Sequence, residues 1–176
     1  MKNLFPALLI LAGTTLSCQQ QTNTATEVPE TATIATESTD AAAVKVMHQM
    51  FEAFNSHDLA AMQTLYADSV VFMSPEMEKP VVGAHHVKTI YGPLFEMAPN
   101  VKDEVKHYIH SNGEVAVEFV STGTIENISP DDPAQMKGKT FELKIFARLK
   151  VKDGKIIEDV SYFDQMAFLK QVGLME

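Results

Sequence analysis

The fold of this chain is decided near its C-terminus, by residues 141–163, which read FELKIFARLKVKDGKIIEDVSYF. Apolar and polar side chains alternate over residues 141–151, as they do along a strand that buries one face, with Phe146 as the one large apolar residue on the polar face. The Asp153-Gly154 pair favours a two-residue hairpin turn, in which both central positions need a positive φ angle. The segment therefore predicts two antiparallel strands joined by a tight turn.

Segments upstream of this hairpin complete a sheet and its helical cover. Alternating residues predict two more strands, over residues 105–110 and 115–127, and a short β-rich run covers residues 70–73. Apolar residues three and four apart predict a helix over about residues 41–56, with Asp40 as its N-cap, and further helices begin near residues 58, 84 and 164. Helices followed by long strands indicate an α+β domain, with a curved antiparallel sheet and helices on one face.

The first residues predict export. Lys2 precedes a short apolar run over residues 4–12, and small residues lead to Cys18, which is the layout of a secretory signal peptide over residues 1–17. The run is about half as long as the roughly 20 apolar residues of a membrane-spanning helix. The segment before Cys18 resembles the lipobox of bacterial lipoproteins, and the resemblance implies lipidation of this residue, the only cysteine of the chain. We therefore expect a lipid anchor to a membrane of the bacterial cell envelope, on the periplasmic or outer-membrane side.

Residues 18–40 are interpreted as a tether. They are rich in Thr, Gln, Ala and Glu, and after the lipidated cysteine they contain only Val28 and Ile34 as large aliphatic residues. A segment with so little apolar surface does not offset its ordering entropy by burial, so we expect disorder rather than a helix. Residues 41–176 then form one domain that is long enough for a core of its own.

The charge of the chain argues against nucleic acid as a partner. The sequence has 14 Lys and Arg against 23 Asp and Glu, a formal net charge of −9, and Arg148 is its one arginine. Nucleic-acid binding requires clustered positive charge that displaces counterions. Since the lysines are scattered among acidic residues, neither nucleic acid nor an anionic lipid surface is expected, and the contact with the membrane is the lipid itself.

Several short segments resemble a known family. The residues that carry the resemblance are Leu65-Tyr66-Ala67-Asp68, Thr122-Gly123-Thr124, Asp153 to Glu158, Tyr162-Phe163-Asp164 and Leu169 to Leu174. Together they resemble the SnoaL-like branch of the nuclear transport factor 2-like superfamily. The resemblance implies a cone-shaped curved sheet wrapped around N-terminal helices, a pocket that is open at one end, and assembly into homodimers. It also implies relatives that include polyketide cyclases, ketosteroid isomerases, dehydratases and proteins without turnover.

The residues that perform chemistry in that family do not recur here. By the same alignment, Met50 stands where the steroid isomerases carry a tyrosine, Ser74 where they carry the general base, and Phe146 near their second acid. Ile125 replaces a histidine of the cyclases, and their strand acid falls near Ala147. The resemblance therefore implies a pocket without the catalytic set of the family.

Strand alternation nevertheless indicates one acid–base pair. Phe163 aligns with a pocket-facing aromatic residue of the isomerases, which turns Ser161 and Asp159 to the same side. His107 shares the face of the apolar residue Val105. A pair of His107 and Asp159 could transfer protons as a general acid or base. The alternative is a core histidine bonded to backbone and a surface aspartate at the end of a strand.

An apolar pocket is the remaining expectation for the site. The residues expected to line it are Phe54, Met50, Met73, Phe119, Ser161 and Phe163. Methionines suit an adaptable pocket, although they equally fill cores. No cofactor or metal is expected, because His107 and His110 lie three apart on a strand and therefore face opposite ways.

Two classes of function stay open at this point. In the first, the pocket binds a small, largely apolar molecule, with or without acid–base turnover of the cyclase or isomerase type. In the second, the domain is a non-catalytic interaction or dimerisation module of the cell envelope. A well-formed cavity with converging polar groups favours the first class. A cavity plugged by aromatic side chains, together with an exposed apolar patch, favours the second.

Overall fold

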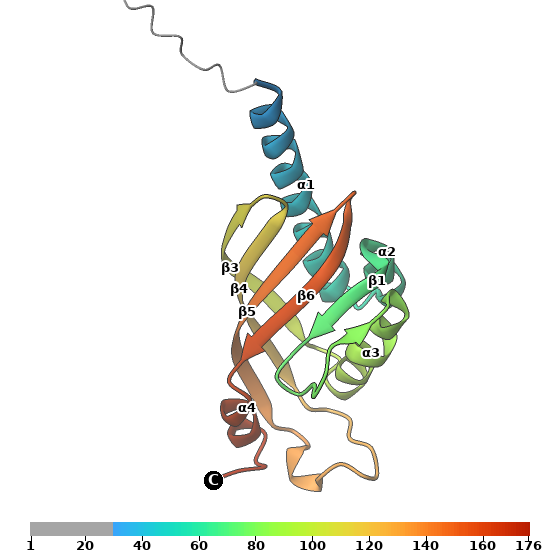
Figure 1. Cartoon of the computed structure of the whole chain (residues 1–176). Helices are drawn as coiled ribbons and strands as arrows, with labels where there is room; N and C mark the ends of the chain where they lie inside the picture. The colour runs from blue at the N-terminus through green and yellow to red at the C-terminus, as the bar shows by residue number, and fades with distance from the viewer. Residues whose placement is uncertain (1–29) are drawn as a thin grey trace, which may run out of the picture.

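The computed structural model describes residues 30–176, which form helices and six strands (Figure 1). In chain order the elements are α1 (Glu30–Asn55), α2 (Leu59–Leu65), β1 (Tyr66–Met73), β2 (Val81–Val82), the 3-10 helix η1 (Ala84–His86), α3 (Val87–Met97), β3 (Lys102–Ser111), β4 (Glu114–Thr124), the 3-10 helix η2 (Ala134–Met136), β5 (Thr140–Lys152), β6 (Lys155–Phe163) and α4 (Gln165–Gln171). This succession confirms the α+β class.

The strands form one curved sheet in the order β2-β1-β6-β5-β4-β3. All neighbouring strands are antiparallel except β1 and β6, which run parallel. The sheet is therefore mixed, and the prediction of a wholly antiparallel sheet is wrong for this pair. Parallel neighbours need a long crossover connection, and here the whole segment from β2 to β5 separates the two strands.

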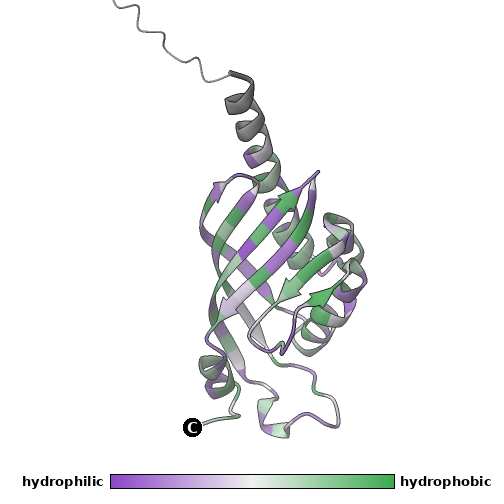
Figure 2. Ribbon diagram, in the orientation of Figure 1, coloured by the Kyte–Doolittle hydropathy of each residue, from purple (hydrophilic) through white to green (hydrophobic). Residues whose placement is uncertain are grey.

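The β5–β6 hairpin follows its sequence pattern. Asp153 and Gly154 have φ angles of 51° and 73°, so both central residues adopt the left-handed conformation that a tight hairpin turn requires. Along β5 the inward-facing residues from Phe141 to Val151 are mostly buried, whereas Phe146 is 48% exposed on the outer face. Hydrophobic and hydrophilic residues alternate along most of β5 in Figure 2.

Helix α1 is longer than the sequence predicted. It begins at Glu30, so residues 30–40 are helical where a disordered tether was expected. The stretch contains no Gly or Pro, and it continues a helix whose packed half includes the fully buried Met47. Asp40 lies inside the helix rather than at its cap, and its Oδ1 accepts a hydrogen bond of 2.8 Å from the backbone N–H of Gly113. In Figure 1 the first turns of α1 extend past the end of the sheet.

The predicted signal peptide, Cys18 and the first part of the tether lie outside the residues that the structure describes. Within residues 30–176, no helix combines the length and the apolar character needed to cross a membrane.

Strand β3 contains a bulge that reverses its inward and outward faces. Its register with β4 shifts between Val105 and His107. An extra residue at this point exchanges the two faces of the strand beyond it. Val105 and Tyr108 are half-buried, whereas His107 and Ile109 are exposed. The prediction that His107 shares the apolar face of the strand is therefore wrong, and the ladder places it opposite Glu118 on the outer face.

The core lies between the concave face of the sheet and the helices. Met47 of α1 and Met62 of α2 are fully buried there. The rings of Phe51 and Phe119 meet edge to face with a centroid distance of 4.9 Å, which joins α1 to β4. A cavity remains beside this packing, between the sheet and helices α1 and α3, and Phe119 is part of its lining.

Candidate functional site

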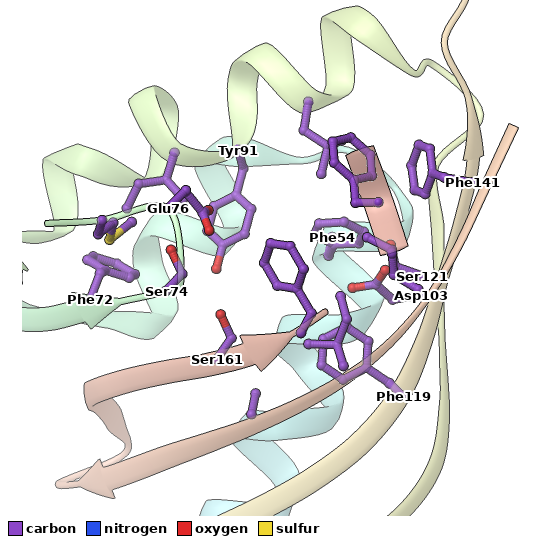
Figure 3. A pocket seen from close by; sticks show the side chains of 18 of the residues that line it. Phe54, Phe72, Ser74, Glu76, Tyr91, Asp103, Phe119, Ser121, Phe141 and Ser161 are labelled. Atoms are coloured by element: carbon purple, nitrogen blue, oxygen red, sulfur yellow. The ribbon is translucent and has the colours of Figure 1, made fainter. Parts of the chain in front are cut away.

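The cavity has a volume of about 270 Å³. Pockets for small molecules start at about 300 Å³, so this one suits a compact ligand. Its wall is mostly apolar, with side chains from α1, α3 and the inner face of the sheet (Figure 3). The polar residues of the lining are Ser74, Glu76, Tyr91, Asp103, Ser121 and Ser161.

Strand register places a carboxyl group in the wall between aromatic rings. Asp103 of β3 pairs with Ser121 of β4, which pairs with Leu143 of β5, so these three residues form one row across the sheet. Phe119 and Phe141 belong to the rows on either side, because residues two apart on a strand share a face. Figure 3 shows Asp103 next to Ser121 within this aromatic surround.

The backbone of Asp103 is fixed by α1. The side chain of Asn55 donates from Nδ2 to the carbonyl oxygen of Asp103 and accepts the backbone N–H of Asp103 at Oδ1, each at 2.8 Å. The carboxylate itself is less well satisfied, since its buried Oδ1 has no hydrogen-bond partner among the described residues. Burial raises the pKa of Asp103 to about 7, and the neighbouring Ser121 hydroxyl offsets part of the rise.

A second buried carboxyl group lies behind the opposite wall. Asp159 of β6 is 7% exposed, and its Oδ2 accepts from the hydroxyls of Tyr66 at 2.7 Å and Tyr91 at 3.3 Å. Burial raises the pKa of Asp159 to about 6, and the two hydroxyls lower it in part. Burial and this carboxylate raise the pKa of both tyrosines well above the usual range, so both hydroxyls keep their protons. Tyr91 itself lines the cavity.

The end of β1 contributes a third polar group. Ser74 is 8% exposed, and its buried Oγ has no hydrogen-bond partner in the described part of the chain. Glu76 follows it in the loop after β1 and also lines the cavity. In Figure 3 the Ser74 side chain, just after β1, lies beside the Tyr91 hydroxyl, and the Ser161 side chain of β6 lies below it. The cavity therefore has two polar regions, one at Asp103 and one between β1, β6 and α3.

Most residues predicted for the pocket lie in its lining: Met50, Phe54, Phe119, Ser161 and Phe163. Met73 does not. It is half-buried at the end of β1, where it pairs with Val160 of β6. The structure also does not bring His107 and Asp159 together, because the β3 bulge turns His107 to the outer face while Asp159 is bonded to two tyrosines on the inner side.

Sequence reasoning missed Asp103 and Tyr91. A signal for Asp103 was present, because it lies two residues before Val105 on a strand whose apolar face had been identified, and an acid at an inward position is unusual. Tyr91 lies in the helix predicted to begin near residue 84, among apolar residues such as Ile90 and Leu94, and offered no such signal. Its role depends on Asp159, which is 68 residues away in the sequence.

The arrangement can exchange protons at neutral pH. A general acid or base works best when its pKa lies near the operating pH, and Asp103 meets this condition inside an apolar cavity. Metal chemistry has no comparable support, since no group of three or more potential ligands among His, Cys, Asp and Glu gathers anywhere in residues 30–176.

Comparisons with known proteins agree with this architecture. A family model described as a SnoaL-like domain matches residues 47–159. No curated protein matches the chain significantly. IdmH of Streptomyces antibioticus, a proposed polyketide cyclase, is similar to it with a TM-score of 0.64 and 24% identity over 74% of this chain and 98% of IdmH.

Two further solved structures contain small molecules. A protein of Catenulispora acidiphila with a ketosteroid isomerase-like fold, in complex with trimethylamine, has a TM-score of 0.61 and 19% identity over 73% of this chain and 92% of its own. TerC, co-crystallised with polyporic acid, has a TM-score of 0.62 and 14% identity over 75% of this chain and 98% of its own. At these identities the likeness concerns the fold.

Proposed function

The chain belongs to the SnoaL-like domain family, whose model spans residues 47–159, and from this premise we propose that its cavity binds a small, largely apolar molecule. The observation that carries the proposal is an apolar cavity of about 270 Å³ with the unpaired carboxylate oxygen of Asp103 in its wall. Similar structures with trimethylamine and polyporic acid support it, since both are small molecules held by this fold.

A bound molecule would stabilise the domain by filling the cavity. Its apolar walls lack the dispersion contacts that packed side chains make elsewhere in the core. Asp103 Oδ1 and Ser74 Oγ are buried without a hydrogen bond from a described residue, and each such group costs about 1–3 kcal/mol. A ligand with an apolar body and one or two polar groups would supply both the dispersion contacts and the hydrogen bonds.

We propose Asp103 as the group that would carry out acid–base turnover in this cavity, of the cyclisation, isomerisation or hydration type. It faces the cavity and has a pKa of about 7, so its two protonation states interconvert near neutral pH. The pair of His107 and Asp159 is not suited to this role, because His107 is exposed on the outer face. Tyr91, whose hydroxyl proton is donated to Asp159, is placed to accept a hydrogen bond from the bound molecule at its oxygen.

Native mass spectrometry of the full chain, purified from the envelope of its host, tests the binding proposal. We expect a co-purifying small molecule at one per chain, and its partial or complete loss in Asp103→Asn. Glu118→Gln provides a matched control, because Glu118 is an exposed carboxylate on the outer face of the adjacent strand. A ligand-free mass for the wild-type chain, unchanged after incubation with the host's small-molecule extract, would contradict the proposal.

We also propose that the protein is exported and anchored by lipid at Cys18, at the surface of a bacterial envelope membrane. Lys2, the apolar run over residues 4–12 and the single cysteine support this proposal. Metabolic labelling with an alkyne-tagged fatty acid should mark the wild-type chain and Ser17→Ala but leave Cys18→Ser unmarked. Equal labelling of Cys18→Ser would exclude this anchor.

The second candidate function, a dimerisation module, is favoured by the outer face of the sheet. Ile109 and Tyr162 are each 62% exposed there, and Tyr162 lies opposite the exposed Phe146 in the β5–β6 ladder. Arg148 on the same face bonds to Glu114 at 3.5 Å, so the face carries both charges and can complement a second copy of itself. Sedimentation velocity should then give a dimer for the wild-type chain and a monomer for Phe146→Lys; a wild-type monomer at high concentration excludes this assembly.

A further inference from the structure

All side chains of the cavity lining that can carry a full charge at neutral pH are acidic. Glu76 and Asp103 contribute carboxyl groups, whereas none of the lining residues, all of which lie in the described part of the chain, is Lys, Arg or His. A buried carboxylate is normally paired with a cation or fully hydrogen-bonded. Asp103 has neither at its Oδ1 within residues 30–176, and burial raises its pKa to about 7. A positively charged group would supply such a partner.

Aromatic rings surround the same carboxyl group. Phe119 and Phe141 lie in the rows that flank Asp103 on the sheet. Gly123 lets the Phe141 ring lie against β4 on this side, because a Cβ atom at that position would come within 2.7 Å of the ring carbon Cζ. Phe54 of α1 completes the surround (Figure 3), and its ring contacts that of Phe95 at a centroid distance of 5.0 Å. Ring faces attract organic cations through their negative quadrupole.

We propose that the Asp103 end of the cavity binds the positively charged group of a small organic ammonium ion, while the apolar remainder of the cavity holds its hydrocarbon body. The inference rests on the proposed binding function and adds the chemical class of the ligand. A compact amine with one ring suits a cavity of about 270 Å³. A metal ion does not suit it, because carboxylate and ring faces supply too few oxygen ligands.

The ionisation of Asp103 controls this binding, so the neighbouring groups must be considered. From α3 the group that faces the cavity is Tyr91, with Asp159 of β6 behind it, and Glu76 faces it from the loop after β1. The α1 neighbours Asn55 and Phe54 carry no charge, and β4 presents Ser121. All charged neighbours are therefore acidic, and none of them competes with the ammonium group for the carboxylate.

Benzyltrimethylammonium and neopentylbenzene are a matched pair of probes, since they have nearly the same shape and only the first is charged. The quaternary ammonium has no proton to lose, so any pH dependence of its binding belongs to the protein. With a pKa of about 7 for Asp103, its dissociation constant should increase about 90-fold from pH 8 to pH 5, because protonation competes with the cation. Neopentylbenzene should bind with little change.

Isothermal titration of the full-length chain at pH 8 tests the proposal. We expect the cation to bind at least tenfold more tightly than the neutral probe, and Asp103→Asn to abolish that preference while Glu118→Gln keeps it. If both probes bind equally and without pH dependence, the cation inference is wrong and the small-molecule pocket stands. If neither probe binds the wild-type chain, the proposed function fails as well. The pH series on the wild-type chain keeps the test valid even when Asp103→Asn does not fold.

Discussion

Replacing Asp103 with asparagine is expected to remove much of the pH dependence of the stability of this protein. Burial raises the pKa of Asp103 from 3.8 to about 7 in the folded state, so the native chain holds a proton that the unfolded chain has already released. Stability from this group is therefore greatest at low pH and is lost as the pH rises from about 4 to about 7. Between pH 5 and pH 8 the native state binds this extra proton over an interval equivalent to about two pH units. Each unit corresponds to about 1.36 kcal/mol, so the free energy of unfolding falls by about 2.7 kcal/mol.

Urea unfolding at pH 5 and pH 8 measures this difference in the wild-type chain and in Asp103→Asn. The difference between the two pH values should be smaller in the variant by about 2.7 kcal/mol, because contributions from all other groups are common to both proteins. Asp131→Asn, an exposed aspartate in the loop after β4, should behave like the wild type. A change of less than about 1 kcal/mol in Asp103→Asn would refute the argument, since it means that the native carboxyl is not held protonated near neutral pH.

Three further substitutions test the packing around the site and the contact between α1 and the β3–β4 turn. Tyr66→Phe removes the 2.7 Å hydrogen bond to Asp159 and should lower the free energy of unfolding by about 1–3 kcal/mol. The pKa of Asp159, measured by NMR titration, should rise because this hydroxyl lowers it in the wild type, and an unchanged pKa argues against the bond. Gly123→Ala brings a methyl group within 2.7 Å of the Phe141 ring, so thermal unfolding should show a loss of about 1–3 kcal/mol; unchanged stability contradicts the close packing. Asp40→Ala should speed amide hydrogen exchange at the β3–β4 turn, and unchanged exchange there contradicts the bond between α1 and that turn.

The parts of the fold that were predictable have local causes. The β5–β6 hairpin depends on a period of two residues along each strand and on the Asp153-Gly154 turn, and both signals are contained in one short segment. The amphipathic part of α1 was predictable for the same reason, because its apolar spacing matches the helical period. The N-terminal extension of α1 was not, since composition alone does not reveal that a packed helix continues into a polar stretch.

The candidate site was predicted in part. The apolar lining was expected from residue type and, for Phe163, from the resemblance to the isomerases, and both Phe119 and Phe163 line the cavity. Parity failed on β3, where one extra residue between Val105 and His107 exchanges the two faces. A bulge has no fixed sequence signal, so His107, which was predicted on the inner face of the sheet, lies on the outer face. The same strand carries Asp103 before the bulge, on the inner side.

The class of the fold, the β5–β6 hairpin and the apolar character of the interior were readable from the residues alone, because periodicity and turn chemistry act between near neighbours. The tertiary structure alone decided which carboxyl groups face the cavity and what they contact. Asp159 is satisfied by tyrosines that lie 93 and 68 residues away, and Asp103 is left with an unpaired oxygen among aromatic rings. Protonation at neutral pH is a property of burial and of distant partners, so only the packed chain could assign it.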